Sequence, residues 1–318
     1  MKRLIAILLL GLFLALPCAA SAAVFNNARD YIPAPPDTFV TMTYFEHVTA
    51  QFAFVNGRKL TNDAGLTENV GLLRPIYFMK LGPFIIDPNV IIPVGNVSVN
   101  SGSGLGAVNH STTGFGDILA ICTFWLWHQD KTKTYAGVTP ILIAPTGTFS
   151  SNKTVNFGAN RWSGNIQGFF AKGWEIIPGH NLYGEAEVMG QFYGDNSDSF
   201  DPAFFRARHS FRNRGTLSQE PELDFEGHLS YDLTKTVFAA FDYYGTFLGR
   251  QKFEGRSLGT LANSTLGVSV AYSFAPGFQL MLQYQGGVAT NTGTQNNTIL
   301  ARFLWATDGK SLRRAVSQ

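Results

Sequence analysis

The chain has few of the charged residues and cysteines on which soluble and disulfide-linked proteins rely. Charged residues make up 14% of its 318 residues, whereas a soluble globular domain carries about 25%. Of its two cysteines only Cys122 lies beyond the first 20 residues, which excludes a disulfide framework and a cysteine-based metal site. The formal net charge of +2 gives no electrostatic reason to expect a nucleic-acid partner.

Long apolar runs are also missing, with one short exception at the start. Met1-Lys2-Arg3 is basic, Leu4 to Leu16 is apolar, and Ala20-Ser21-Ala22 fits the small-x-small pattern that signal peptidase reads. A run of about 13 residues is too short to span a bilayer. We therefore expect a signal peptide at residues 1–22, cleaved after Ala22 or Ala23.

What the chain does have is aromatic residues and a two-residue period. Aromatic residues reach 14%, as many as the charged ones. From Glu222 to Asp232 every even position is polar, and the odd positions include Leu223, Phe225 and Leu229. A strand puts these two sets on opposite faces, whereas a helix would mix them. Without a transmembrane helix, such alternation in a membrane protein indicates a closed β-barrel.

Twelve segments show this alternation or fit a strand of similar length. They span residues 38–56, 66–80, 83–94, 114–128, 132–146, 160–174, 181–194, 220–232, 236–249, 260–274, 277–290 and 296–306. Short connections alternate with longer polar ones, including 195–219, 250–259 and 291–295, as in outer-membrane barrels. We predict an all-β transmembrane antiparallel barrel of about 12 strands at residues 23–306, with periplasmic termini and a polar tail at 307–318.

Several stretches resemble a known family. They are Ile92-Pro93-Val94-Gly95, Gly114-Phe115-Gly116-Asp117-Ile118 after a Gly-rich loop, Asn156 to Trp162, Asp224 to Asp232, and Leu300 to Trp305. Their order along the chain is similar to that of the outer-membrane transporter family associated with the meta-pathway of phenol degradation. The resemblance implies a barrel in the outer membrane and a role in the uptake of hydrophobic or aromatic compounds.

The polar faces of the seventh and eighth predicted strands form the first candidate site. By parity, the lumen-facing candidates are Glu185, Glu187, Gln191, Glu222, Asp224, Glu226 and His228, with Arg161 and Arg302 on the same inner side. One interpretation is a pore wall that favours cations or polar substrates. The other is a hydrated lumen in which these carboxylates pair with Arg161 and Arg302.

The predicted loop 195–219 forms the second candidate site. Its loop or gate candidates are Arg206, Arg208, Arg212 and Arg214, interleaved with Phe204, Phe205 and Phe211. Guanidinium groups stack on rings and bind carboxylate or phosphate oxygens. The loop could therefore capture an anionic aromatic ligand at the mouth, contact lipopolysaccharide phosphates, or be a mobile basic loop. Asp195, Asp198 and Asp201 lack the spacing of a calcium loop.

Catalytic motifs are missing from the sequence. It contains no HExxH and no Gly-x-Ser-x-Gly motif, so we expect no catalytic residues, no metal site and no cofactor. An outer-membrane enzyme, for which His228 and Ser230 are the best local pair, or an adhesin on the same scaffold is the alternative function. Five tryptophans are expected as anchors at the membrane interfaces: Trp125, Trp127, Trp162, Trp174 and Trp305.

Together these features predict a channel in the bacterial outer membrane for passive uptake of small, hydrophobic or aromatic solutes. Its expected partners are outer-membrane lipid, lipopolysaccharide and the small-molecule solute, without nucleic acid. Nothing in the sequence assigns an oligomeric state.

Overall fold

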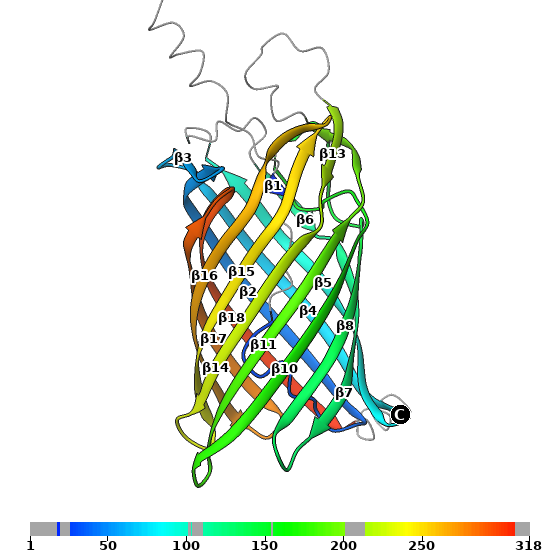
Figure 1. Cartoon of the computed structure of the whole chain (residues 1–318), viewed down its shortest axis with the longest axis vertical. Coiled ribbons are helices and arrows are strands. Elements are labelled where there is room, and N and C mark those ends of the chain that lie inside the picture. The colour runs from blue at the N-terminus through cyan, green and yellow to red at the C-terminus, as the bar shows by residue number, and fades with distance from the viewer. Residues whose placement is uncertain are drawn as a thin grey trace, which may run out of the picture.

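Twelve long antiparallel strands form a closed barrel (Figure 1). The computed structural model describes residues 18–19, 26–100, 103, 111–153, 155–200 and 214–308. The barrel strands are β2 (Thr38–Val55), β4 (Leu66–Leu81), β5 (Phe84–Val99), β7 (Ile118–Gln129), β8 (Thr134–Ala144), β10 (Ser163–Ile177), β11 (His180–Tyr193), β14 (Glu222–Asp232), β15 (Val237–Phe253), β16 (Arg256–Ala275), β17 (Phe278–Thr290) and β18 (Gly293–Asp308). The last strand closes on the first, from Gly293 against Phe54 to Asp308 against Thr38. The predicted all-β barrel and its strand number are confirmed.

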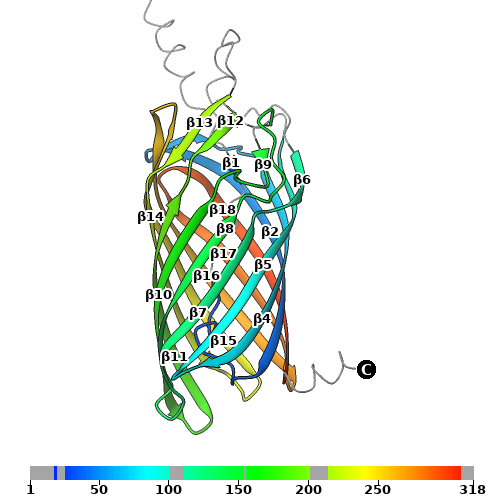
Figure 2. The same cartoon turned by 90° about the vertical axis from the view of Figure 1, so that its right-hand side faces the viewer.

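The two ends of the barrel differ. Turns of two to four residues join β4 to β5, β7 to β8, β10 to β11, β14 to β15 and β16 to β17. We call this the short-turn end, and Figures 1 and 2 show that β2 begins and β18 ends there. The opposite, long-loop end carries the short strands β1 (Cys18–Ala19), β3 (Arg58–Thr61), β6 (Ser111–Phe115), β9 (Val155–Asn156), β12 (Asn196–Phe200) and β13 (Arg214–Gln219).

Two of the predicted long loops are wrong. β15 continues to Phe253 and β16 begins at Arg256, so residues 250–259 form the end of a hairpin with a two-residue turn. The connection after β17 is likewise only residues 291–292. Polar residues here predict loops, but strands that extend past the bilayer need no apolar face.

Among the described residues, no helix is long and apolar enough to cross a membrane.

The outer surface of the barrel is apolar. On β14, Phe225 and Leu229 are 36% and 53% exposed, while the alternate side chains are buried inside. On β16, Val268 and Val270 point outward and are followed by the exposed rings of Tyr272 and Phe274. This is the arrangement of an apolar band with an aromatic girdle at the membrane interface.

Four of the five tryptophans are exposed, but Trp125 is not. Trp127, Trp162 and Trp174 are between 47% and 58% exposed, and Trp305 is 37% exposed. Trp125 is 1% exposed, and its indole N–H donates to the backbone oxygen of Tyr31 at 2.9 Å. Its prediction as a membrane anchor is therefore wrong. It points inward on a strand that is apolar on both faces.

An arginine on the outer surface should destabilise the barrel according to its depth. Val268, 56% exposed in the middle of the apolar band, and Leu248, 59% exposed towards the long-loop end, form a matched pair. We expect Val268→Arg to lower the free energy of unfolding by about 2–4 kcal/mol and Leu248→Arg by about 0–1 kcal/mol. Urea unfolding in phospholipid vesicles measures both values. Equal losses of unfolding free energy in the two variants would contradict the prediction that Val268 lies deeper in the bilayer than Leu248.

Candidate functional site

The lumen contains residues 26–37, which precede β2 and are called the N-terminal segment. Figure 2 shows this dark-blue segment inside the half of the barrel towards the short-turn end. Local bonds fold it into turns: Asp30 N–H donates to Asn27 O at 3.1 Å and Ile32 N–H to Arg29 O at 3.4 Å. Twelve strands enclose more space than the eight-stranded barrels that side chains fill. The segment occupies part of that space.

The acidic residues predicted on the seventh and eighth strands hold this segment. Glu187 on β11 lies opposite Glu226 on β14. The backbone N–H of Asn26 donates to both carboxylate oxygens of Glu226, at 3.1 and 3.3 Å, and its side-chain amide donates to Glu187 at 3.2 Å. The Tyr31 hydroxyl contacts both carboxylates, and Arg29 N–H donates to Glu185 at 2.7 Å. These carboxylates therefore bind backbone and side-chain donors of the N-terminal segment.

The environment of Tyr31 fixes its role as a donor. Burial, followed by the charges of Glu226 and Glu187, raises the pKa of the Tyr31 hydroxyl well above its ordinary value. The hydroxyl therefore stays protonated and donates its hydrogen to the carboxylates. Its ring stacks on Phe169 with centroids 4.9 Å apart, which fixes the segment against the barrel wall.

We call the five inward carboxylates of β11 and β14 the acidic wall: Glu185, Glu187, Glu222, Asp224 and Glu226. Nearer the long-loop end, its carboxylates accept hydrogen bonds from neutral side chains. Gln191 donates to Asp224 and, at 3.4 Å, to Glu222. Glu222 also accepts hydrogen bonds from the hydroxyl of Tyr193 at 3.2 Å and the amide of Gln219 at 2.8 Å. All five predicted carboxylates, with Gln191 and His228, are buried within the barrel.

Among the described residues, neither Arg161 nor Arg302 forms the expected ion pair with one of these carboxylates. Arg302 forms an ion pair with Asp30 of the N-terminal segment at 2.6 Å. Arg161 donates to Gln219 at 2.6 Å, and its guanidinium lies 4.4 Å from the centre of the Tyr193 ring. Both arginines are buried inside the barrel. Arg302 also donates to Gln279 at 2.9 Å, near the short-turn end, whereas the contacts of Arg161 lie near the long-loop end.

His228 and Ser230 have separate partners. His228 Nδ1 lies 2.8 Å from Asp242 Oδ1, and Ser230 Oγ accepts a hydrogen bond from Arg29 Nε at 3.1 Å. Asp242 also accepts the Gln283 amide at 2.7 Å. No described hydrogen bond therefore joins His228 to Ser230, as a general base and its nucleophile would require. Among the described residues, no cluster of His, Cys, Asp and Glu could hold a metal ion.

Opposite the acidic wall, the inner surface of the barrel is mostly apolar. Three buried clusters follow one another, mainly along β2, β4, β5, β7 and β8, and a few buried polar side chains, such as Arg74, Asp87 and Asn89, lie on the same strands. Towards the long-loop end the cluster contains Ala50, Leu66, Val70, Val97, Val99, Val155 and Phe157. The middle cluster contains Ile91, Leu119, Ile121, Ile141 and Met189, with Leu72 against both. Towards the short-turn end lie Val40, Met42, Ile76, Phe78, Ile85 and Trp125, among others. The lumen thus has one polar and one apolar side.

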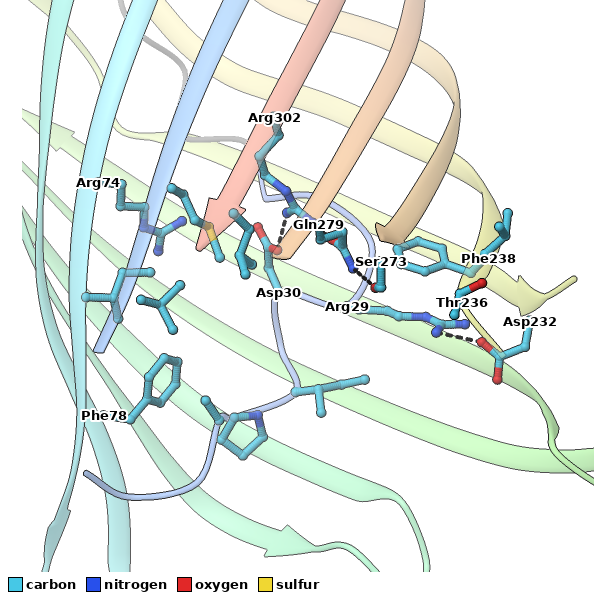
Figure 3. A pocket seen from close by; sticks show the side chains of 18 of the residues that line it. Arg29, Asp30, Arg74, Phe78, Asp232, Thr236, Phe238, Ser273, Gln279 and Arg302 are labelled. Atoms are coloured by element: carbon cyan, nitrogen blue, oxygen red, sulfur yellow. Dashed lines mark hydrogen bonds and ion pairs between the residues drawn. The ribbon is translucent and has the colours of Figure 1, made fainter. Parts of the chain in front are cut away.

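A cavity of about 260 Å³ lies between the N-terminal segment and this apolar side. Figure 3 shows it bordered by Arg29 and Asp30 from the segment and by Arg74, Phe78 and Phe238 from the strands. A second cavity of about 20 Å³ shares Asp30, Arg74 and Asp87 with the first and extends to Ile121 and Ile141 of the middle cluster. Most of its other lining side chains are polar, among them Thr123, Thr139 and Gln167. The two cavities therefore extend from the short-turn end to the middle of the barrel, and both adjoin the apolar side.

At the long-loop end, two of the stretches that carry the family resemblance, Gly114 to Ile118 and Asn156 to Trp162, meet around Asp117. Its carboxylate accepts the N–H of Gly147 at 2.8 Å and of Ala159 at 2.7 Å. Burial raises the pKa of Asp117 above its ordinary value, although these N–H groups act to lower it. The backbones of Gly147 and Gly158 pass so close that a Cβ on either would lie 2.7 Å or less from the other. The contact holds Phe157, 3% exposed, against the apolar side.

Removing the Asp117 carboxylate should free the residues it holds. Each hydrogen bond to a charged group contributes about 1.5–3 kcal/mol, so Asp117→Ala should accelerate amide hydrogen exchange at Gly147 and Ala159 at least tenfold. Asp117→Asn keeps one acceptor oxygen and should show a smaller effect. Exchange measured by mass spectrometry tests this. Unchanged protection in Asp117→Ala would mean that the loop is held by its other contacts alone.

Of the predicted gate residues, only Arg214 lies within the described part. It is exposed and contacts Asp198 at 3.6 Å and Asn152 at 2.9 Å, both at the long-loop end, and no described contact joins it to the acidic wall. The others lie outside the described residues: Phe204, Phe205, Arg206, Arg208, Phe211 and Arg212.

Comparison with known proteins supports the fold. A crystal structure of an outer membrane channel from Pseudomonas putida F1 is 21% identical, with 89% of this chain and 100% of that chain covered and a TM-score of 0.79. The toluene transporter TodX of P. putida is 8% identical, with coverage of 86% and 91% and a TM-score of 0.46, too low to support an argument.

A search of curated proteins found no match. Residues 49–303, most of the chain, match the family described as "Putative MetA-pathway of phenol degradation". The chain is an outer-membrane-type β-barrel that belongs to this family.

Proposed function

We propose that the protein lets small hydrophobic or aromatic solutes cross the outer membrane along the apolar side of its lumen. The observation that carries this proposal is the series of three apolar clusters that runs between the two ends of the barrel. A water-filled pore for polar solutes has a polar lining. Here these clusters instead offer contacts to an apolar ring, at about 25 cal/mol for each Å² removed from water.

The N-terminal segment acts as a movable plug in this proposal. It lies next to both cavities, and a solute passing from the smaller to the larger has to displace Asp30, which lines both. Several of its bonds are to side chains: Asn26 with Glu226, Arg29 with Asp232 and Asp30 with Arg302. Such contacts can be exchanged one at a time, whereas a strand within the sheet cannot leave without opening the barrel.

The topology of the proposed plug follows from the expected processing. We take the short-turn end as periplasmic, as in other outer-membrane barrels. Cleavage after Ala22 or Ala23 leaves three or two residues before Asn26. The plug is then a free chain end, joined covalently only to β2, and it can swing towards the periplasm.

Uptake by whole cells tests the proposal, because lipopolysaccharide limits the entry of apolar solutes there. The protein would be expressed in a Gram-negative host without its own general porins, and initial uptake of labelled toluene and lactose would be measured. We expect toluene uptake to increase at least fivefold over the empty host and lactose uptake to stay unchanged. No increase for toluene, or an equal increase for lactose, would overturn the proposed function.

A further inference from the structure

The cavity at the short-turn end combines apolar and cationic linings. Its apolar surface includes Met42, Ile76, Phe78 and Phe238, and Figure 3 shows Phe78 and Phe238 on different sides of the cavity. Arg29, Arg74, Lys235 and Arg302 also line it, together with three carboxylates, Asp30, Asp87 and Asp232. A cavity of about 260 Å³ has room for one aromatic ring with a small substituent. Its lining resembles neither a purely apolar pocket nor a polar channel.

Each of the three carboxylates already has close partners. Asp232 pairs with Arg29 at 2.7 Å and Asp30 with Arg302 at 2.6 Å. Asp87 accepts the N–H of Thr123 at 2.8 Å and the amide of Asn89 at 3.3 Å. These contacts are drawn in part in Figure 3. Asp87 faces the third arginine of the lining through Asn89 and not in a direct ion pair.

That arginine is Arg74. It is 8% exposed and lies on the inner face of β4 between Leu72 and Ile76. Its Nε donates to Asn89 at 3.1 Å and it contacts the Tyr44 hydroxyl, with Asp30 and Asp87 at longer range. Within the described residues no carboxylate lies within ion-pair distance of it. The four cationic side chains of the lining exceed its three carboxylates by one, and this excess positive charge favours a monoanion.

We propose that this cavity binds the monoanion of an aromatic acid, with its carboxylate on Arg74 and its ring against Phe78, Met42 and Ile76. A planar guanidinium matches a carboxylate with two parallel hydrogen bonds. The ring gains by burial beside the apolar side chains. A neutral hydrocarbon gains nothing from the excess positive charge of the lining, and the charge of a dianion is larger than this excess. The inference rests on the proposed function for how the acid reaches the cavity.

The position of Arg74 makes this site a point of selection. Arg74 lines both cavities, so a solute moving along the apolar side meets its guanidinium at the step between them. An aromatic acid is held at this step, whereas a solute without a charge lacks the ion pair. The protein then distinguishes among aromatic solutes by charge as well as by hydrophobicity.

Calorimetric titration of the folded full-length barrel in detergent micelles tests the site without requiring transport. The probes are benzoate, its neutral isostere benzamide, and acetate, which carries the charge without the ring. We expect benzoate to bind at least tenfold more tightly than either. Arg74→Gln should weaken benzoate binding at least tenfold, and Lys80→Gln, an exposed charge on the same strand outside the cavity, should leave it within twofold.

A second variant protects the test against misfolding. Ile76→Phe adds volume to the cavity while keeping Arg74, and it should also weaken benzoate binding. Heat-modifiable migration on gels verifies that each variant is folded. Equal binding of benzoate and benzamide, or unchanged binding in folded Arg74→Gln, would overturn the inference. Benzoate binding without toluene uptake would contradict only the proposed function, and uptake without benzoate binding would contradict only this site.

Discussion

Deletion of residues 26–34 should raise the single-channel conductance of the barrel about tenfold or more, because the deletion empties the lumen of its plug. The exposed inner surface then includes Glu185, Glu187 and Glu226, which the segment covers in the intact protein. The open channel should therefore favour cations over anions. Planar-bilayer recordings in asymmetric salt measure conductance and ion preference in the same experiment.

A milder change should give an intermediate result. Replacing Glu187 and Glu226 with glutamine keeps the shape of the wall but removes the charges that accept hydrogen bonds from Asn26 and Tyr31. We expect this variant to show brief openings at the conductance of the deletion variant. If the deletion leaves conductance unchanged, the N-terminal segment does not limit passage through the lumen.

Polar substitutions on the apolar side should slow the uptake of hydrocarbons. Leu119 and Ile121 are 2% and 5% exposed and belong to the middle cluster. Exchanging both for threonine keeps β-strand propensity but puts two hydroxyl groups beside the route. We expect toluene uptake by whole cells to fall about tenfold, since burial of a ring against a hydroxyl without a partner costs about 1–3 kcal/mol.

The matched control lies on the same strand with the opposite parity. Ala120 and Cys122 alternate with the lumen residues of β7, so Ala120→Thr with Cys122→Thr adds the same groups outside the lumen. This control should keep toluene uptake within twofold of the unmodified protein. Equal losses in both double variants would point to a general defect in folding and would contradict a route along the apolar side.

Much of the barrel could be predicted because lipid imposes a simple rule. A strand between lipid and lumen alternates in polarity, and Glu222 to Asp232 does so without exception on its even positions. The rule does not apply beyond the bilayer, which is why the polar residues 250–259 predict a loop although they form the end of a hairpin. It is also weak for β7, whose two faces are both apolar. The pattern therefore does not distinguish the inner face of β7 from its outer face, and the expectation that Trp125 is a membrane anchor is wrong.

The partner of the acidic wall could not be predicted from sequence patterns. Asn26 contacts Glu187 and Glu226, 161 and 200 residues further along the chain, and residues 26–37 have no periodicity that assigns them to a wall. Similarly, the motif with Asp117 indicated a family, but its contacts with Gly147 and Ala159 exist only in the folded loop. The one available signal was the stretch of polar and proline residues between the expected cleavage site and the first strand.

Cross-linking the N-terminal segment to the wall tests most directly whether it is a movable plug. The side chains of Asn27 and Gln283 are hydrogen-bonded at 3.3 Å, so Asn27→Cys and Gln283→Cys, with Cys122→Ser, can be joined by a short bifunctional methanethiosulfonate. We predict that joining them abolishes toluene uptake and that dithiothreitol restores it, while either single cysteine variant is unaffected by the reagent. Full uptake by the cross-linked protein would contradict the account, because solute would then pass without movement of the segment.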